Sequence, residues 1–510
     1  MSLAESEPRA PSGVPKRELG FIALASMLLP WLNPFAPGPS AAIGPYLASV
    51  ACAAVLWVAL GAPGWRAGDR AAVIAGGWAI AAVASSAIAL GQYFGLADAF
   101  SPWVNAPGAG QAYANLRQRN QFATLTVMGL AALLWWDSRG RNRRLVGAGV
   151  VLLAAGCAAS ASRTGLLQLG VLIALTALWP QPQRNRRLTL CLLGAVSYLA
   201  AALFLPRVLQ LILGIEAPHI WDRITTGEGC ASRTVLWGNV LYLIAQKPWL
   251  GWGWGQLDYA HYVTLYPGAR FCDILDNAHN LPLHLAVEFG LPLALALLLG
   301  LAVLVIRARP WAERDATRQL AWSVLAVIGL HSLLEYPLWY GPFEIAAVLA
   351  IVLLWPARAE SRPPPRAAAL RLPLAVLVLA MTLYAAWDYR RVSQIYLPYE
   401  ARLPEYREDT LDKVRDSRLF RDQALFAELT LTELTPANAE WTLATARRLL
   451  RYSPEPRVIE KLIESATMLG RYDEAVEHLA RFRAAFPEAH RDWRQRLSLP
   501  GASAVARTAG

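Results

Sequence analysis

The chain has 510 residues, of which 55% are apolar and 17% charged, and its mean hydropathy is +0.32. Soluble proteins carry about a quarter charged residues, so this composition excludes an ordinary soluble protein and predicts that much of the chain lies in lipid. A disordered chain and a disulfide-knotted small domain are also excluded, because apolar residues dominate and there are only five cysteines. The formal net charge of +11 suits either nucleic acid or a membrane.

Eleven apolar stretches approach or reach the length of about 20 residues that crosses a hydrocarbon core as a helix. They predict an all-α fold, a polytopic membrane helix bundle of about eleven spans. In chain order the predicted spans are 19–35, 41–60, 71–96, 121–136, 145–161, 166–179, 188–205, 281–306, 320–338, 342–355 and 372–387.

Lysine and arginine cluster in alternate connections between these stretches, as at 139–144 and 184–187, and cytoplasmic loops collect such residues. This bias places the N-terminus in the cytoplasm and the C-terminus in the periplasm of a bacterial inner-membrane, multi-pass protein. This bias explains the positive charge, so the sequence no longer supports a nucleic-acid partner. The predicted parts are a cytoplasmic tail (1–18), a transmembrane catalytic bundle (19–387) with a large periplasmic loop (206–280), and a periplasmic helical domain (388–510).

The predicted helical domain is dense in balanced charge, and its segment GRYDEAVEHLARFRAAFP is similar to the second half of a tetratricopeptide unit. In that unit Tyr472, Ala475, Leu479 and Phe482 face a neighbouring helix. A small tetratricopeptide-like domain with one such helix pair is favoured, and a peptide-binding surface is the alternative.

The cysteines divide into two groups. Cys52, Cys157 and Cys191 fall inside predicted spans and are interpreted as small packing residues. Cys230 and Cys272 both fall in the exported loop, where an oxidising compartment lets them form a disulfide. Two free thiols are the alternative.

Ionisable groups at the exported ends of spans are the candidate functional residues, because charge in lipid is costly unless water or a partner receives it. Arg117 and Arg119, with Gln118 between them, stand there against the arginine bias and indicate an anion site; snorkelling to headgroups is the alternative. Arg163 lies in a tight exported turn, and Arg233 begins an amphipathic segment in the exported loop.

The segment DNAHNLPLHLAVEFG brings His279 and Asn280 to the water boundary, where an imidazole can act as a general base near neutral pH. His284 and Glu288, four residues apart, are interpreted as a structural pair. A Gly/Trp-rich turn at 251–255 is weak evidence for phosphate binding, and a simple interfacial loop is an interpretation at least as well supported.

The segment HSLLEYPLWY adds His331, Glu335, Tyr336 and Tyr340 to the candidates. The structural alternative for this segment is an interfacial aromatic belt with one acid whose hydrogen bonds are satisfied.

No Walker loop, Rossmann fingerprint, HExxH or zinc spacing occurs in the sequence, so ATP, NAD and zinc chemistry lack support, and we predict no cofactor. A transfer reaction outside the cytoplasm then needs a donor that is already activated, such as a lipid-linked pyrophosphate.

Five motifs in order carry a family resemblance: NLRQRNQFA, SRTGLLQL, the R…W…P..G.G.G stretch, DNAHNLPLHLAVEFG and HSLLEYPLWY. Together they resemble the bacterial protein O-oligosaccharyltransferases of the pilin-glycosylating type, within the O-antigen ligase and polymerase superfamily. The resemblance implies a GT-C type membrane fold. It also implies transfer of a glycan from undecaprenyl pyrophosphate to Ser or Thr hydroxyls of an exported acceptor protein such as pilin, without a catalytic metal. The segment GPSAAIGPYLASV lacks the acidic residue that the resemblance leads us to expect after Tyr46.

For such a transfer, arginines gather the charge that builds on the departing pyrophosphate, because a guanidinium stays protonated and binds phosphate oxygens bidentately. The predicted catalytic residues are Arg163 and Arg233, with His279 as the base that deprotonates the acceptor in an inverting reaction. The candidate substrate-binding residues are Arg117, Gln118, Arg119, Asn280, Tyr336 and Tyr340. The alternatives are an O-antigen ligase that delivers the glycan to lipid A core and a lipid-linked glycan transporter, although the halves of the chain show no clear symmetry.

Overall fold

The computed structural model describes residues 16–36, 40–63, 65–181, 183–216, 229–355 and 365–498. Within these ranges the regular elements are all helices, which confirms the predicted all-α fold.

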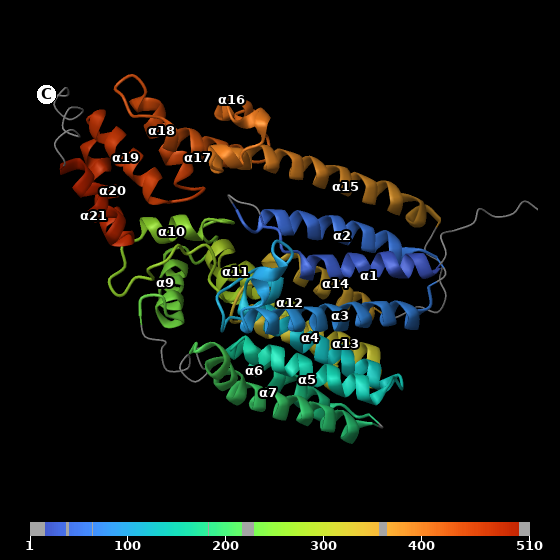
Figure 1. The fold of residues 1–510 in the computed structure, drawn as a ribbon. Coiled ribbons are helices and arrows are strands. Elements are labelled where there is room, and N and C mark those ends of the chain that lie inside the picture. The colour runs from blue at the N-terminus through green and yellow to red at the C-terminus, as the bar shows by residue number, and fades with distance from the viewer. Residues whose placement is uncertain are drawn as a thin grey trace, which may run out of the picture.

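The larger part of the chain is a bundle of helices that run side by side (Figure 1). Its helices are α1 (Lys16–Leu32), α2 (Ile43–Gly61), α3 (Ala67–Tyr93), α4 (Arg119–Ser138), α5 (Arg143–Ala159), α6 (Arg163–Leu178), α7 (Arg184–Leu213), α11 (Leu281–Phe289), α12 (Leu291–Ala308), α13 (Ala316–Ser332), α14 (Gly341–Leu354) and α15 (Pro365–Ser393). We call the end at which α2, α4, α6 and α14 begin the site end, and the opposite end the basic end.

Ten of the eleven predicted spans fall on one helix each, and the predicted span 281–306 falls on two helices. Five helices, α2, α3, α7, α12 and α15, are long and apolar enough to cross a membrane, and α6 and α14 are shorter apolar helices. The count of about eleven spans therefore stays a prediction.

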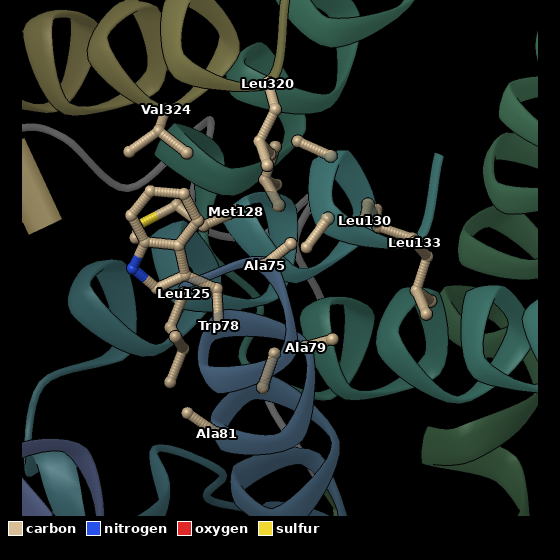
Figure 2. Packing of buried hydrophobic residues seen from close by; sticks show 14 of the residues in the cluster. Ala75, Trp78, Ala79, Ala81, Leu125, Met128, Leu130, Leu133, Leu320 and Val324 are labelled. Carbon is tan, nitrogen blue, oxygen red and sulfur yellow. The ribbon is translucent and has the colours of Figure 1, made fainter. Parts of the chain in front are cut away.

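The centre of the bundle is the contact between α3 and α4, where Trp78, Leu125 and Met128 are almost fully buried (Figure 2). Small residues let these helices approach: a Cβ on Gly129 would lie 2.3 Å from the Cβ of Ala82. By contrast, only 6% of the most apolar stretch of α12 is buried within the protein. Because α12 carries almost no charge, this exposed apolar surface indicates contact with lipid.

The predicted span 281–306 is not one helix, which corrects the sequence interpretation. The structure divides it at Gly290, where φ is +85° and ψ is 164°, into α11 and α12. The Gly/Trp-rich turn packs its backbone into the break. The Leu291 amide donates to Pro248 O at 2.8 Å, the Trp252 amide to Val287 O at 2.8 Å. Polar backbone groups freed by the break therefore find partners in this turn.

The break depends on the absence of a side chain at Gly290, because a Cβ there would lie 2.2 Å from Trp249 O. We therefore expect Gly290→Ala to lower the free energy of unfolding by about 2 kcal/mol or more, from steric overlap and a backbone conformation that only glycine adopts readily. Thermal unfolding of the purified protein in detergent measures this.

Gly300→Ala is the matched control, since it lies inside α12 with no other atom within 4 Å of a built Cβ. Its melting temperature should stay equal or rise, because alanine favours the helix. Equal melting temperatures for wild type and Gly290→Ala would contradict the proposed constraint.

A second correction concerns α7, which continues through Pro206 to Leu213 instead of ending near residue 205. The predicted exported loop therefore begins about eight residues later, at Gly214. Its residues 217–228 lie outside the described ranges.

After these residues the loop forms α9 (Arg233–Gln246) and α10 (Leu257–Val263), which lie at the site end (Figure 1). Cys230 is bonded to Cys272, with 5.4 Å between their Cα atoms, whereas Cys52, Cys157 and Cys191 are free and buried. The disulfide joins the start of α9 to the segment that leads to His279.

The C-terminal helices are α16 (Thr410–Val414), α17 (Arg421–Leu431), α18 (Ala439–Leu449), α19 (Pro456–Met468), α20 (Tyr472–Ala485) and α21 (Pro487–Ser498). Short 3₁₀ helices complete the described elements: η1 (Ala97–Phe100), η2 (Ala114–Leu116), η3 (Pro310–Ala312), η4 (Pro337–Trp339), η5 (Gln394–Tyr396), η6 (Tyr399–Ala401) and η7 (Pro404–Tyr406).

The C-terminal helices pack on the loop through α10. Tyr262 belongs to their hydrophobic core, and its hydroxyl lies 2.9 Å from Nδ1 of His478. Arg481 Nε donates to Val263 O at 3.0 Å. The loop is therefore supported from the side opposite the bundle.

Within α20, Ala475 and Phe482 are buried and Leu479 packs against the same core, as predicted. Tyr472 is 64% exposed, so its predicted contact with a neighbouring helix is wrong. It is the first residue of α20, ahead of the turns that pack against the core. The tetratricopeptide likeness itself stays a prediction.

Candidate active site

A cavity of about 760 Å³ lies at the site end, between the bundle and the loop that contains α9 and α10. Three predicted catalytic residues and one predicted binding residue line it: Arg163, Arg233, His279 and Tyr336. They come from α6, α9, the segment before α11, and the turn after α13. The fold therefore brings together residues that are up to 173 positions apart in the sequence.

Arg163 and Arg233 occupy equivalent places on two helices, each inside the tripeptide Ser-Arg-Thr. Each arginine is the first helical residue after a serine cap: the Ser162 hydroxyl accepts from the Gly165 amide at 3.0 Å, and the Ser232 hydroxyl from the Val235 amide at 3.3 Å. The amino end of a helix carries partial positive charge. Two helix starts and two guanidiniums at one cavity therefore favour an anion.

Glu335 joins the basic groups of the site. Its carboxylate oxygen Oε1 forms an ion pair with Arg233 Nη2, and its Oε2 lies 2.6 Å from His279 Nδ1. The side chain of Glu335 is only 11% exposed, so its charge is compensated mainly by these two partners. Because Nδ1 of His279 is the nitrogen that contacts the carboxylate, Nε2 is the ring nitrogen that does not take part in this contact.

The same carboxylate is linked to the start of α6 through a chain of hydrogen bonds. Asn120 Nδ2 donates to Glu335 Oε1 at 3.3 Å, and the Ser162 hydroxyl donates to Asn120 Oδ1 at 2.6 Å. The cap that positions Arg163 and the acid that positions His279 therefore belong to one network.

The backbone of His279 is held in the left-handed region, with φ of +50°. This conformation costs about 1 kcal/mol or more for a residue with a side chain. Two asparagines fix it: Asn277 Oδ1 accepts from the His279 amide at 2.9 Å, and Asn280 Nδ2 donates to Leu333 O at 3.0 Å. Asn280 also caps α11, since its Oδ1 accepts from the Leu283 amide.

The Tyr336 ring meets His279 edge to face, with ring centroids 4.8 Å apart, and stacks on Tyr340 at 5.8 Å. Tyr340 lies on the far side of this stack, where it lines a separate cavity of about 310 Å³ together with Arg117 and Gln118. Of the two tyrosines, Tyr336 is therefore the one that lines the 760 Å³ cavity.

Of the other predicted binding residues, Arg117 and Gln118 form hydrogen bonds with protein groups near the 310 Å³ cavity. Arg117 donates to Pro34 O and to Asn105 Oδ1. Gln118 caps α4, because its Oε1 accepts from the Gln121 amide at 2.6 Å. Arg119 is the first residue of α4 and is partly buried.

His284 and Glu288 form the structural pair that the sequence indicated. Their Nε2 and Oε2 atoms lie 3.4 Å apart, and both side chains are buried. Glu288 Oε1 also accepts from the Gly255 amide at 2.8 Å, which ties α11 to the Gly/Trp-rich turn. This pair supports the segment that carries His279.

Sequence reasoning missed the central position of Glu335 and the presence of Asp273 and Asp276 in the cavity lining. The available signal for Glu335 was an acid at the end of an apolar span, where an unpartnered charge is costly. Its partners, 102 and 56 residues away along the chain, gave no local pattern.

Burial raises the pKa of Asp276, and the nearby His279 opposes this shift. For Asp258 in α10, burial raises the pKa from 3.8 to about 7; the Tyr259 backbone amide opposes the shift and Asp276 adds to it. Burial therefore disfavours the charged form of both acids, of which Asp276 lines the cavity.

The raised pKa of Asp258 predicts a pH dependence of stability. Between about pH 4 and pH 7 the folded chain keeps a proton that the unfolded chain releases, so this group's contribution is greatest near pH 4 and is lost as the pH rises to about 7. We expect Asp258→Asn to melt at a higher temperature than wild type at pH 8 and at the same temperature near pH 4.

Thermal unfolding at both pH values measures this, with the exposed Asp492→Asn as the control. A stabilisation of Asp258→Asn that is equal at both pH values would contradict the titration argument.

Comparison with known proteins gives three family matches. Residues 148–298 match the family described as O-Antigen ligase, residues 319–498 match Virulence factor membrane-bound polymerase, C-terminal, and residues 112–136 match Protein glycosylation ligase. These segments contain Arg163, Arg233, His279 and Glu335. The matches confirm the resemblance to the O-antigen ligase and protein glycosylation ligase families, and with the apolar helices they identify a membrane protein.

Two relatives come from Acinetobacter baylyi (strain ATCC 33305 / BD413 / ADP1). The General O-oligosaccharyltransferase is 26% identical over 272 residues, which cover 51% of this chain and 46% of the relative. The ComP-specific O-oligosaccharyltransferase is 26% identical over 238 residues, 46% of this chain and 42% of the relative. The chain thus matches somewhat less than half the length of each relative. No solved structure matches it significantly.

Proposed function

We propose, on the premise of this resemblance to O-antigen ligases and protein glycosylation ligases, that the protein is a glycosyltransferase. It moves a glycan from undecaprenyl pyrophosphate to a Ser or Thr hydroxyl of an exported protein such as a pilin. The observation that carries the proposal is the buried carboxylate of Glu335, which contacts both an arginine and a histidine that line one polar cavity.

In the proposed reaction the bond between the anomeric carbon and the pyrophosphate oxygen breaks as the acceptor oxygen attacks from the opposite face. Negative charge builds on the leaving pyrophosphate, and Arg163 and Arg233 stabilise it by charge-assisted hydrogen bonds. The guanidiniums supply this charge stabilisation, so the proposed mechanism needs no metal ion. Attack from the opposite face inverts the configuration at the anomeric carbon.

The proton of the acceptor hydroxyl goes to His279 Nε2 in this scheme. Glu335 holds the ring through Nδ1 at 2.6 Å and stabilises the imidazolium that forms. Glu335 is therefore a positioning residue, and His279 is the group that contacts the substrate. The Tyr336 ring packs edge to face against the imidazole and limits its movement.

We expect His279→Ala to lower the transfer rate by about 10²–10⁴ fold, because the general base is lost. Purified protein with a lipid-linked glycan and an acceptor peptide measures this, with expression and melting temperature as folding controls. Turnover near the wild-type rate in a folded variant would remove His279 from the mechanism.

We expect Glu335→Gln to lower kcat by about 10²–10⁴ fold with little change in KM for the acceptor, because the imidazolium loses its counter-charge. The pH profile of kcat should also change, since the group that interacts with His279 no longer carries charge. Glu335→Asp should recover part of the rate. An unchanged pH profile would reduce Glu335 to a structural role.

Arg163→Lys keeps the charge but loses the planar fork that binds two phosphate oxygens, so we expect a loss of about 10²–10³ fold in kcat/KM. Arg207→Lys, an exposed arginine of α7, is the matched control. Equal effects of the two substitutions would contradict the proposed pyrophosphate contact.

An O-antigen ligase that delivers the same glycan to lipid A core is the second candidate, favoured by the O-antigen ligase match over residues 148–298. Intact mass of a coexpressed pilin separates the two: a glycan on the protein supports the proposal, and a glycan only on lipopolysaccharide contradicts it. Product formation by the purified protein also separates both enzymes from a lipid-linked glycan transporter.

A further inference from the structure

A third cavity, which His279 does not line, lies along the bundle between α2, α14 and α15. Its volume is about 530 Å³, within the range of about 300–1,000 Å³ that is typical of small-molecule sites. Of its lining residues only Arg70 and Glu344 are ionisable, and most others are aliphatic, as with Ala53, Leu56 and Val348. We call this cavity the apolar groove.

The groove is closed toward the site end. A Cβ on Gly341 would lie 2.2 Å from the Cβ of Ser49, so α14 and α2 are in direct contact there. From Val50 to Gly61 the groove follows twelve residues of α2, about 17 Å of helix. This length is close to half of the ~30 Å hydrocarbon core, the depth of one leaflet.

Two arginines with like charge stand at the basic end of the groove. Arg371 of α15 donates to Gly61 O, and a Cβ on Gly61 would lie 2.5 Å from Arg371 Nη1. Gly61, which Arg371 contacts, lines the groove together with Arg70. The Nε atom of Arg70 is buried and has no hydrogen-bond partner.

No ion pair within the described ranges includes Arg70 or Arg371. Other arginines at the same end have partners: Arg186 pairs with Asp137, and Arg187 donates to Gln319 Oε1 at 2.7 Å. Two adjacent guanidiniums without a carboxylate, one of them with a buried unused donor, favour an external anion.

We propose that the apolar groove binds an anionic glycerophospholipid of the bilayer. Its phosphate lies between Arg70 and Arg371, and one acyl chain follows α2 and α14 toward Gly341. The anion site and the apolar cavity adjoin, which suits a molecule that carries both a phosphate and an acyl chain. A free inorganic anion would leave the aliphatic walls without an occupant.

The test measures lipid binding to the delipidated, full-length protein by native mass spectrometry, with phosphatidylglycerol and phosphatidylcholine as the two probes. Two cationic contacts at a membrane surface predict a preference of roughly tenfold or more for phosphatidylglycerol in the wild type. Equal binding of the two lipids by the wild type would overturn the proposal.

The double variant Arg70→Gln/Arg371→Gln should bring this preference close to parity. Arg143→Gln/Arg144→Gln removes the same charge from two exposed residues at the start of α5 and is the matched control. An equal loss of preference in the control variant would show a general surface charge effect and overturn the site.

A second variant tests the acyl-chain part of the proposal and covers the case in which the arginine variant fails to fold. Ala53→Phe fills the groove and should lower phosphatidylglycerol binding severalfold, whereas Ala148→Phe on an exposed face of α5 should not. Unchanged binding in Ala53→Phe, or full displacement of the lipid by millimolar inorganic phosphate, would overturn the lipid assignment. These readouts do not involve glycan transfer.

Discussion

The requirement that a buried charge have a partner governs the site end of this protein. Glu335 stands where the apolar helix α13 ends, and its carboxylate is almost fully covered. A single partner would leave one oxygen uncompensated, and the fold supplies Arg233 to one oxygen and His279 to the other. The rest of the site follows from this arrangement, since it fixes both the ring of the base and the start of α9.

The site also depends on support from outside the bundle. The disulfide between Cys230 and Cys272 connects the two segments of the loop that carry Arg233 and His279. The contact of Tyr262 with the C-terminal helices holds the loop from its other side. Because Arg163 belongs to the bundle and Arg233 to the loop, the two arginines line one cavity only while the loop packs on the bundle.

The sequence predicted the helical bundle well, because a span needs a long apolar stretch and such a stretch is visible locally. It also singled out Arg163, Arg233 and His279, which the structure brings to one cavity, since charge at the edge of a span is rare. It did not predict the break at Gly290, which depends on a turn some forty residues earlier, nor the role of Glu335, whose partners are distant in the chain. The exposed Tyr472 shows that a local motif does not fix which residues of a helix pack.

The network around Glu335 has a consequence for exchanging parts between related proteins. It ties together the start of α4, the cap of α6, the loop, and the turn after α13. A chimera that replaces only the loop before α11 would combine a histidine and an arginine from one protein with the Glu335 carboxylate of another. A joint transplant of residues 229–340 would keep the contacts of Glu335 with Arg233 and His279, whereas its hydrogen bond from Asn120 would still depend on α4 of the recipient.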